Sequence, residues 1–232
     1  VSGSELAITS AIQKLIVATD VTGITLYQAN QQTYKFLRYG VSVQTAVGEN
    51  NEQVHLIDWQ NPEKNDFALA EEVTLRGGYE RRPDIVLYIN GIAVSVIELK
   101  RSSVEVSDGI RQLRTNQEKI FNEGFFSTVQ LLFAGNDSQG LHYGTVTTEE
   151  KLFVQWKSSN GDPQITGSLL DNPLSEMCEK SKLLDLIKNF IIFDAGRKKV
   201  PRQHQFEAIK AAQKRIIKKE GGVVWHTQGS GK

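Results

Sequence analysis

Two carboxylates and a lysine lie at one end of an apolar hairpin in the middle of this chain. Asp84 directly precedes the apolar run Ile85–Ile89, and Glu98 and Lys100 close the second apolar run. Asn90-Gly91, between the two runs, is typical of a tight turn that joins antiparallel strands. The spacing therefore indicates paired strands that bring three charged side chains to the same end of a hairpin.

The pairing register of this hairpin decides whether the three side chains share one face. Glu98 and Lys100 are two residues apart on a strand, so they project from the same face. With a two-residue Asn90-Gly91 turn, Asp84 would fall opposite Ile97 and would project from the other face. A tight turn without any bulge would therefore argue against a shared metal site.

A different register brings the acids together. If Tyr88 pairs with Ile92 across a three-residue loop, Asp84 falls opposite Val96 and shares the face of Glu98. We therefore predict this three-residue loop, or else a bulge lower in the hairpin.

The three side chains suit metal-assisted phosphate chemistry. Mg²⁺ prefers oxygen ligands and keeps several waters, so Asp84, Glu98 and the main-chain carbonyl of Leu99 would form an open site. Such a metal lowers the pKa of a bound water and offsets charge on a scissile phosphate. Lys100 would position that water or stabilise the developing charge. The pattern predicts a magnesium-dependent nuclease; the alternative is a surface hairpin whose charged ends face solvent.

Apolar periodicity indicates the elements around this hairpin. Helical spacing predicts helices over residues 5–18, 31–40, 107–121, 175–192 and 203–219. Apolar runs predict strands from residue 54, within 66–75, over 84–100 and over 129–134. A Gly/Pro/Ser/Asp-rich stretch at 160–173 reads as a loop or linker. We expect an endonuclease domain over 1–160, a linker and connecting helix over 161–200, and the start of an ATPase domain over 201–232.

A second signal follows the apolar residues Val223–Trp225, which we expect to form a strand. A Gly-Ser-Gly-Lys loop after a strand can cradle phosphate, because its backbone N–H groups point at the phosphate oxygens and the lysine adds a charge. His226 stands where the general pattern has glycine. A flexible loop is the alternative interpretation. The candidate nucleotide-binding residues of this loop are Thr227, Gly229, Ser230, Gly231 and Lys232.

Composition places few limits on function. The chain has 232 residues with 27 Lys and Arg and 27 Asp and Glu, so no global positive field attracts nucleic acid. A local patch would suffice, and residues 197–219 carry nine basic residues against one acid, Glu207. A solvated helix face is the alternative.

The single cysteine, Cys178, is expected to be a buried thiol in a reducing compartment. With no membrane span or secretory signal, we expect a cytoplasmic protein.

Residues 81–84 together with 96–100 resemble the PD-(D/E)xK nuclease motif, in the form found in the restriction subunit of type I restriction enzymes. The resemblance extends through residues 56–62 and 65–67 to 226–232, and covers essentially the whole chain. It implies an α/β fold with a restriction-endonuclease-like core, a mixed sheet flanked by helices. Matched residue by residue, Asp84 and Glu98 are the metal-binding acids and Lys100 is the catalytic lysine.

The family also has a Gln-x-x-x-Tyr motif on the helix that follows the hairpin. Gln112 matches its glutamine, whereas Asn116 stands where tyrosine is usual. The i,i+4 spacing puts both side chains on one helix face, which we expect to point at the hairpin. The resemblance thus adds Gln112 to the candidate catalytic residues and leaves the role of this helix open.

The end of the chain resembles motif I of superfamily 2 helicases, with Gln205 similar to their adenine-reading glutamine. This resemblance implies the start of a RecA-like motor domain in a full-length subunit that uses ATP and Mg²⁺ to translocate and cut double-stranded DNA, in complex with modification and specificity subunits. We expect that this fragment itself neither hydrolyses ATP nor binds it tightly. A stand-alone repair or recombination nuclease and a non-catalytic docking module are the alternatives.

Overall fold

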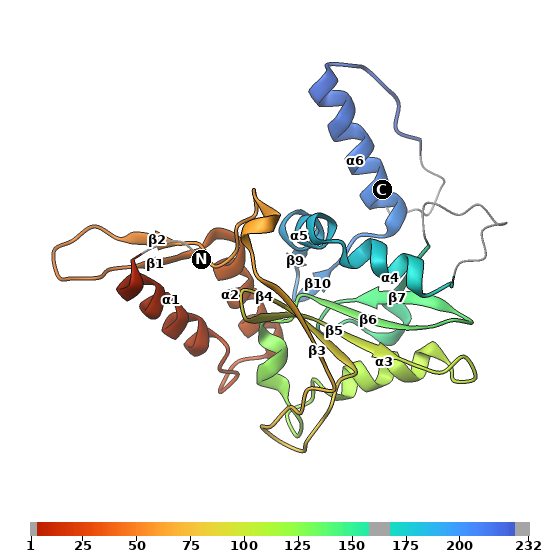
Figure 1. Ribbon diagram of the computed structural model, residues 1–232, viewed down its shortest axis with the longest axis horizontal. Helices are drawn as coiled ribbons and strands as arrows, with labels where there is room; N and C mark the ends of the chain where they lie inside the picture. The colour runs from red at the N-terminus through yellow and green to blue at the C-terminus, as the bar shows by residue number, and fades with distance from the viewer. Residues whose placement is uncertain (1–3, 158–167, 226–232) are drawn as a thin grey trace.

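The computed structural model describes residues 4–157 and 168–225, and a six-stranded sheet forms its centre (Figure 1). The strand order is β3-β4-β5-β6-β7-β8, in which the β5–β6 pair is parallel and the other four pairs are antiparallel. The strands are β3 Phe67–Glu71, β4 Ile85–Ile89, β5 Ile92–Leu99, β6 Leu131–Asn136, β7 Gly140–Gly144 and β8 Val154–Trp156. The predicted α/β fold with a mixed sheet is confirmed.

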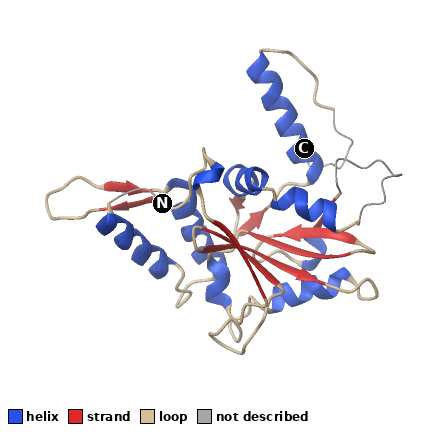
Figure 2. Ribbon diagram, in the orientation of Figure 1, coloured by secondary structure: helices blue, strands red, loops and turns tan. Residues whose placement is uncertain are grey.

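Helices cover both faces of this sheet (Figure 2). Alternate residues of a strand point to opposite faces, so Val96 packs into one apolar cluster with α3 (Val106–Thr115). Its neighbour Ile97 packs into the other cluster, which includes α4 (Asp171–Cys178) and α5 (Lys180–Asn189). The sheet is buried on both sides, which explains why β5 and β6 read as almost continuous apolar runs.

The N-terminal part consists of two helices and a two-stranded ribbon. These are α1 (Glu5–Ala18), α2 (Leu26–Tyr39), β1 (Val41–Val43) and β2 (Glu52–Val54). α1 has the predicted bounds, but α2 begins five residues before the predicted start at residue 31. Thr25 and Gln28 form a capping box at this earlier start, with each side chain bonded to the backbone of the other residue. Gly40 ends the helix with a positive φ of 85°.

Three other expectations about elements are wrong. α3 ends at Thr115 instead of residue 121, because residues 116–122 form turns that lead into the 3₁₀ helix η2 (Glu123–Ser127). The helix predicted over 175–192 is split into α4 and α5 at Glu179, whose carboxylate accepts hydrogen bonds from the first N–H groups of α5. Val223–Trp225 form no strand, and no described strand lies beside them to supply the pairing. Two further short 3₁₀ helices are η1 (Pro62–Lys64) and η3 (Glu150–Leu152).

Helices α4 and α5 pack on the sheet. A two-stranded hairpin of β9 (Ile192–Asp194) and β10 (Arg197–Lys199) follows α5, and α6 (Gln203–Lys218) comes next. A turn with positive φ at Ala195 and Gly196 joins β9 to β10. Leucine and isoleucine side chains of α5 lie in the main apolar cluster with residues of β5 and β6. The domain boundaries at residues 160 and 200 stay predictions, since 158–167 lie outside the described residues.

Within the described residues, no helix is both long and apolar enough to cross a membrane. Cys178 is half-buried in α4, and its burial raises the pKa of the thiol to about 12. A thiol with this pKa stays protonated and poorly reactive at neutral pH.

Candidate active site

The Asn90-Gly91 turn is the tight two-residue form. Ile89 pairs with Ile92 across it, so the predicted three-residue loop is wrong. Asn90 and Gly91 have φ values of 51° and 78°, and two consecutive positive φ angles are what a type I′ hairpin turn requires. The Asn90 side chain also reaches out of the turn, since its Nδ2 donates to the carbonyl of Leu56 at 2.8 Å. The turn alone would place Asp84 on the wrong face.

A bulge lower in the hairpin restores the shared face, as the second prediction required. Tyr88 pairs with Ala93 but Leu87 pairs with Ser95, so β5 carries one extra residue, Val94. Beyond the bulge, Ile85 pairs with Ile97, and one further step places Asp84 opposite Glu98. The prediction of a bulge is confirmed, and the two acids lie on the same face of the sheet.

Glu98 is a buried carboxylate without hydrogen bonds. Its side chain has no exposed surface, and neither carboxylate oxygen has a hydrogen-bond partner among the described residues. Burial, and to a smaller extent the neighbouring Asp84 charge, raise the pKa of Glu98 to about 8 against the opposing effect of Lys100. A buried carboxylate that accepts no hydrogen bond from the described residues, and whose ion pair with Lys100 is 3.7 Å long, is suited to a cation as a further partner.

Asp84 occupies the position where strand β4 no longer pairs with β5. Its Oδ2 accepts a hydrogen bond of 2.6 Å from the backbone N–H of Leu99. In an extended strand the N–H and C=O of one residue point to the same edge. The carbonyl of Leu99 therefore faces the Asp84 side of β5, as its predicted role as a third metal ligand requires. That role itself stays a prediction.

Lys100 is held between Glu98 and α3. Its Nζ lies 3.7 Å from Glu98 Oε2 and donates a hydrogen bond of 2.8 Å to Gln112 Oε1. Its backbone N–H donates to the carbonyl of Gly135, which continues the β5–β6 pairing. A Cβ on Gly109 would lie 3.5 Å from Lys100 Cγ, so α3 passes close to the lysine stem. The structure thus brings Gln112 to the hairpin acids through Lys100.

Asn116 lies at the end of α3 and makes no polar contact with its side chain. It is 1% exposed, and neither its Oδ1 nor its Nδ2 has a hydrogen-bond partner among the described residues. A buried amide without hydrogen bonds lowers the stability of the folded protein unless a water or a ligand forms hydrogen bonds with it. Its burial places the side chain in the protein interior and not on the exposed surface of α3.

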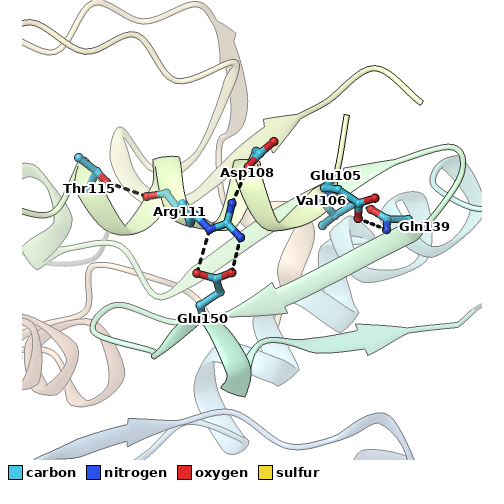
Figure 3. Close-up of polar contacts among 7 residues, drawn as sticks. All are labelled: Glu105, Val106, Asp108, Arg111, Thr115, Gln139 and Glu150. Atoms are coloured by element: carbon cyan, nitrogen blue, oxygen red, sulfur yellow. Dashed lines mark hydrogen bonds and ion pairs between the residues drawn. The ribbon is translucent and has the colours of Figure 1, made fainter. Parts of the chain in front are cut away.

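Contacts outside the hairpin position α3 and therefore Gln112 (Figure 3). The first turn of α3 has no side-chain cap of its own; instead, the Val106 N–H donates to Gln139 Oε1 at 2.7 Å. On the outer surface, Arg111 bridges Asp108 at 2.7 Å and Glu150 at 3.1 Å. Gln139 and Glu150 come from the β6–β7 turn and from η3, so sequence periodicity gave no sign of this support.

The loop between β3 and β4, which ends at Asp84, was also missed from the sequence. Tyr79 N–H donates to the carbonyl of Ile120 at 2.8 Å, and the Arg81 guanidinium lies 3.7 Å from the centre of the Phe121 ring. A Cβ on Gly78 would lie 2.3 Å from the carbonyl oxygens of residues 120 and 121. The one available signal was the Gly77-Gly78 pair, which permits this close approach of two backbones.

The other predicted site residues are distant or outside the described part. Gln205 caps α6, because its Oε1 accepts a hydrogen bond of 2.8 Å from the Arg202 N–H. The candidate phosphate-loop residues Thr227, Gly229, Ser230, Gly231 and Lys232 all lie outside the described residues. No group of three or more His, Cys, Asp or Glu side chains that could hold a metal occurs in residues 4–157 and 168–225. The candidate metal ligands therefore remain the two acids and a backbone carbonyl.

The family described as type I restriction enzyme R protein N terminus matches residues 4–151, which include the hairpin acids, Lys100 and Gln112. The chain belongs to this family. Residues 204–232 match a second family, the SWI2/SNF2 ATPases. The first match covers most of the six-stranded sheet, and the second begins within α6.

Several curated proteins of this restriction family are similar to the chain. A putative type I restriction enzyme endonuclease subunit of Methanocaldococcus jannaschii is 34% identical over 205 residues, which are 80% of this chain and 19% of that protein. The HindI endonuclease subunit of Haemophilus influenzae is 28% identical over 247 residues, 96% of this chain and 23% of that protein. A Staphylococcus aureus endonuclease subunit is 23% identical over 79% of this chain and 20% of its own length. The chain spans about a fifth of the length of these relatives.

Proposed function

We propose that this chain carries a magnesium-dependent endonuclease site that cleaves the phosphodiester bonds of double-stranded DNA. The observation that carries the proposal is the β5 bulge, which places the unsatisfied Glu98 carboxylate opposite Asp84 and beside Lys100. Membership of the type I restriction family supports an endonuclease over a purely structural hairpin.

Each residue has a distinct role in this proposal. Asp84, Glu98 and the carbonyl of Leu99 would hold Mg²⁺, which when bound would supply charge to activate a water and to offset charge on the scissile phosphate. Lys100 is oriented by Gln112 and donates hydrogen bonds to the attacking water or to a phosphate oxygen. Asp84 is itself held by the Leu99 N–H, so the acid pair is positioned before the metal binds.

We further infer that the full-length subunit translocates duplex DNA with ATP, and that modification and specificity subunits direct it to its target. The match of residues 204–232 to the SWI2/SNF2 ATPases supports an ATP-driven motor after the nuclease. The same match favours this interpretation over a stand-alone repair or recombination nuclease. The nucleotide would be bound by the phosphate loop and Gln205 of the full-length protein.

Metal binding tests the site directly. Crystals soaked with Mn²⁺ should give anomalous density between Asp84 and Glu98, and a soaked Glu98→Gln variant should give much less. A hairpin that stays empty at high metal concentration, while the same crystals diffract equally well, would instead favour a non-catalytic docking module.

Cleavage tests the role of Lys100. In the full assembly, Lys100→Ala should lower DNA cleavage by at least about 100-fold, the size typical of losing a group that stabilises charge in the transition state. Translocation and ATP hydrolysis should be retained, because the lysine lies outside the motor match. Lys119→Ala, an exposed lysine just beyond α3, is the matched control and should cleave normally. Equal cleavage by Lys100→Ala and the control would refute the proposed site.

A further inference from the structure

A lysine-rich hollow lies between α5 and α6, and we propose that it binds the phosphate backbone of duplex DNA. We call it the α5–α6 groove; its volume is about 540 Å³, and its charged lining consists of Lys182, Asp185, Lys188, Lys210 and Lys214. This inference rests on the proposed function in one respect only, namely that the protein acts on DNA. It assigns a DNA contact separate from the hairpin acids.

Aromatic packing fixes the two walls of the groove relative to each other. Phe206, in the first turn of α6, is 7% exposed and packs against Phe190 with ring centres 4.6 Å apart. It also packs edge-on against Trp156 at 5.7 Å. Lys210 Nζ on α6 donates a hydrogen bond of 2.8 Å to Asp185 Oδ2 on α5. The groove is therefore built into the fold and does not depend on a mobile side chain.

Among the described residues, two of the four lysine ammonium groups have polar partners and two do not. Lys182 forms an ion pair with Glu176, and Lys210 forms one with Asp185. The Nζ of Lys188, half-buried in the last turn of α5, has no hydrogen-bond or ion-pair partner in the described part of the chain, although the Lys188 backbone carbonyl accepts a hydrogen bond from Tyr34. The Nζ of Lys214, which is exposed, also has no such partner among the described residues. One unpaired positive charge thus lines each wall of the groove.

This local charge contrasts with the rest of the molecule. The whole chain has a net charge of zero, whereas the groove lining carries four lysines against Asp185 alone. Lys210 and Lys214 are four residues apart on α6, so they are neighbours on one helix face. Asp185 is paired with Lys210, so no acid in the groove lining offsets the charge of Lys214 beside it, and a bound polyanion would do so.

The remaining lining residues suit a nucleic-acid backbone more than a small anion. Ser181 and Asn189 supply neutral donors of the kind that contact phosphates, and Trp59 supplies a flat apolar wall. A row of lysines along an open groove can follow a chain of phosphates, whereas a single small anion needs converging donors in an enclosed site. Contacts of this kind carry no base specificity, which suits a protein that moves along DNA.

The groove lies on the opposite side of the sheet from the acids. α5 packs into the apolar cluster of Ile97, while Glu98 shares its face with Val96 and α3 (Figure 1). A phosphate in the groove therefore cannot be the scissile phosphate. We assign the groove to a DNA segment away from the cut, which makes binding and cleavage separable by mutation.

The test measures DNA binding by the full-length protein without divalent metal, so that no cleavage occurs. A fluorescent 40-base-pair duplex is titrated at several salt concentrations with wild type and with Lys188→Ala/Lys214→Ala. The double variant should bind several-fold more weakly at low salt, and the slope of log affinity against log salt should fall by about 2, one per lysine. Lys188→Arg/Lys214→Arg should keep both affinity and slope.

A matched control separates a local contact from a general loss of charge. Lys14→Ala/Lys35→Ala removes the same charge from α1 and α2 and should leave the slope unchanged. As an independent readout, acetylation of the wild-type protein should be slowed by DNA at Lys188 and Lys214 but not at Lys35. This second measurement needs no variant, so a folding defect cannot obscure it.

Each outcome decides the matter. Equal salt slopes for wild type and groove variant, together with unprotected lysines, would overturn the groove proposal. Unchanged DNA binding combined with a lower ATPase rate would show that the groove is covered by another part of the protein, which also overturns it. Normal cleavage by Lys100→Ala would refute the nuclease site alone, and weak binding by the groove variant would still support this inference.

Discussion

Glu98 shows what a single residue contributes to this site. The side chain is fully buried, lacks a hydrogen-bond donor among the described residues and lies opposite another carboxylate. Each of these conditions disfavours the ionised form in the absence of metal, and burial is the largest. Glu98, which we propose as a metal ligand, therefore lowers the stability of the metal-free protein at neutral and high pH.

Replacing Glu98 by glutamine should therefore stabilise the metal-free protein at high pH. The pKa of Glu98 rises from 4.5 to about 8 on folding, so its contribution to stability is present below pH 4.5 and is lost as the pH rises through 8. At pH 9 without metal, Glu98→Gln should unfold with a free energy higher than wild type, by on the order of 3 kcal/mol.

Urea unfolding at pH 5, 7 and 9 in the presence of a chelator measures this difference. Glu118→Gln, at an exposed position beyond α3, serves as the control and should follow wild type at every pH. Adding Mg²⁺ at pH 9 should stabilise wild type more than Glu98→Gln, because the metal supplies the missing partner. Parallel pH curves for wild type and Glu98→Gln would contradict the burial argument.

At the scale of elements, the site depends on α3 and on the loop that precedes Asp84. Both are positioned by contacts that lie far away in the sequence, namely Gln139 and Glu150 for α3 and residues 120–122 for the loop. The loop approaches residues 120 and 121 so closely at Gly78 that no side chain fits there. These two elements bring Lys100 and Asp84 together from opposite sides.

We predict that Gly78→Ala disturbs the site from a distance. The new Cβ would lie 2.3 Å from two backbone carbonyl oxygens, so the loop must move away from residues 120 and 121. Such overpacking typically lowers the free energy of unfolding by about 1–3 kcal/mol. Thermal unfolding and DNA cleavage should both decline. Gly221→Ala, with nothing within 4 Å of the new Cβ, is the control, and equal behaviour of the two variants would exclude a role for the close approach.

At the scale of the whole molecule, a buried lysine ties the last part of the chain to the nuclease core. Lys198 on β10 is 5% exposed, and its Nζ donates at 2.7 Å to Asn30 Oδ1 on α2 and at 2.7 Å to Gln130 Oε1 before β6. No carboxylate appears among its partners in the described residues, and burial lowers the pKa of Lys198 well below 10.5. The β9–β10 hairpin is thus anchored by polar contacts in an apolar setting.

Lys198 should give the protein a stability that rises with pH. A lysine whose pKa is lowered on folding contributes stability above its unfolded pKa near 10.5, and this is lost as the pH falls. Between pH 8 and 10 the free energy of unfolding of wild type should therefore rise relative to Lys198→Met, by up to about 1.4 kcal/mol per pH unit. The exposed neighbour Lys199→Met is the control and should track wild type. Urea unfolding across this pH range decides the matter.

Much of this protein could be predicted from local sequence. Asp84, Glu98 and Lys100 were predicted as candidates from residue type and spacing, because the chemistry of metal and phosphate binding limits which side chains can serve. Gln112 was added only by the family resemblance. The bounds of α1 and the approximate positions of β3 to β6 followed from apolar periodicity, which burial of one helix face or of a whole strand imposes, whereas β7 and β8 were not predicted. The sequence also showed that the hairpin needs a register shift if Asp84 and Glu98 are to share one face, because residues along a strand alternate between the two faces of the sheet.

Only the tertiary structure decided where in the hairpin this register shift occurs. Asn90-Gly91 forms the tight turn that its local preference favours. The register shift occurs at Val94 instead, and the residue types there do not predict a bulge. The caps of α3, the close approach at Gly78 and the burial of Lys198 depend on partners dozens of residues away. Periodicity reports only which face of an element is apolar, and long-range contacts determine which side chains finally meet.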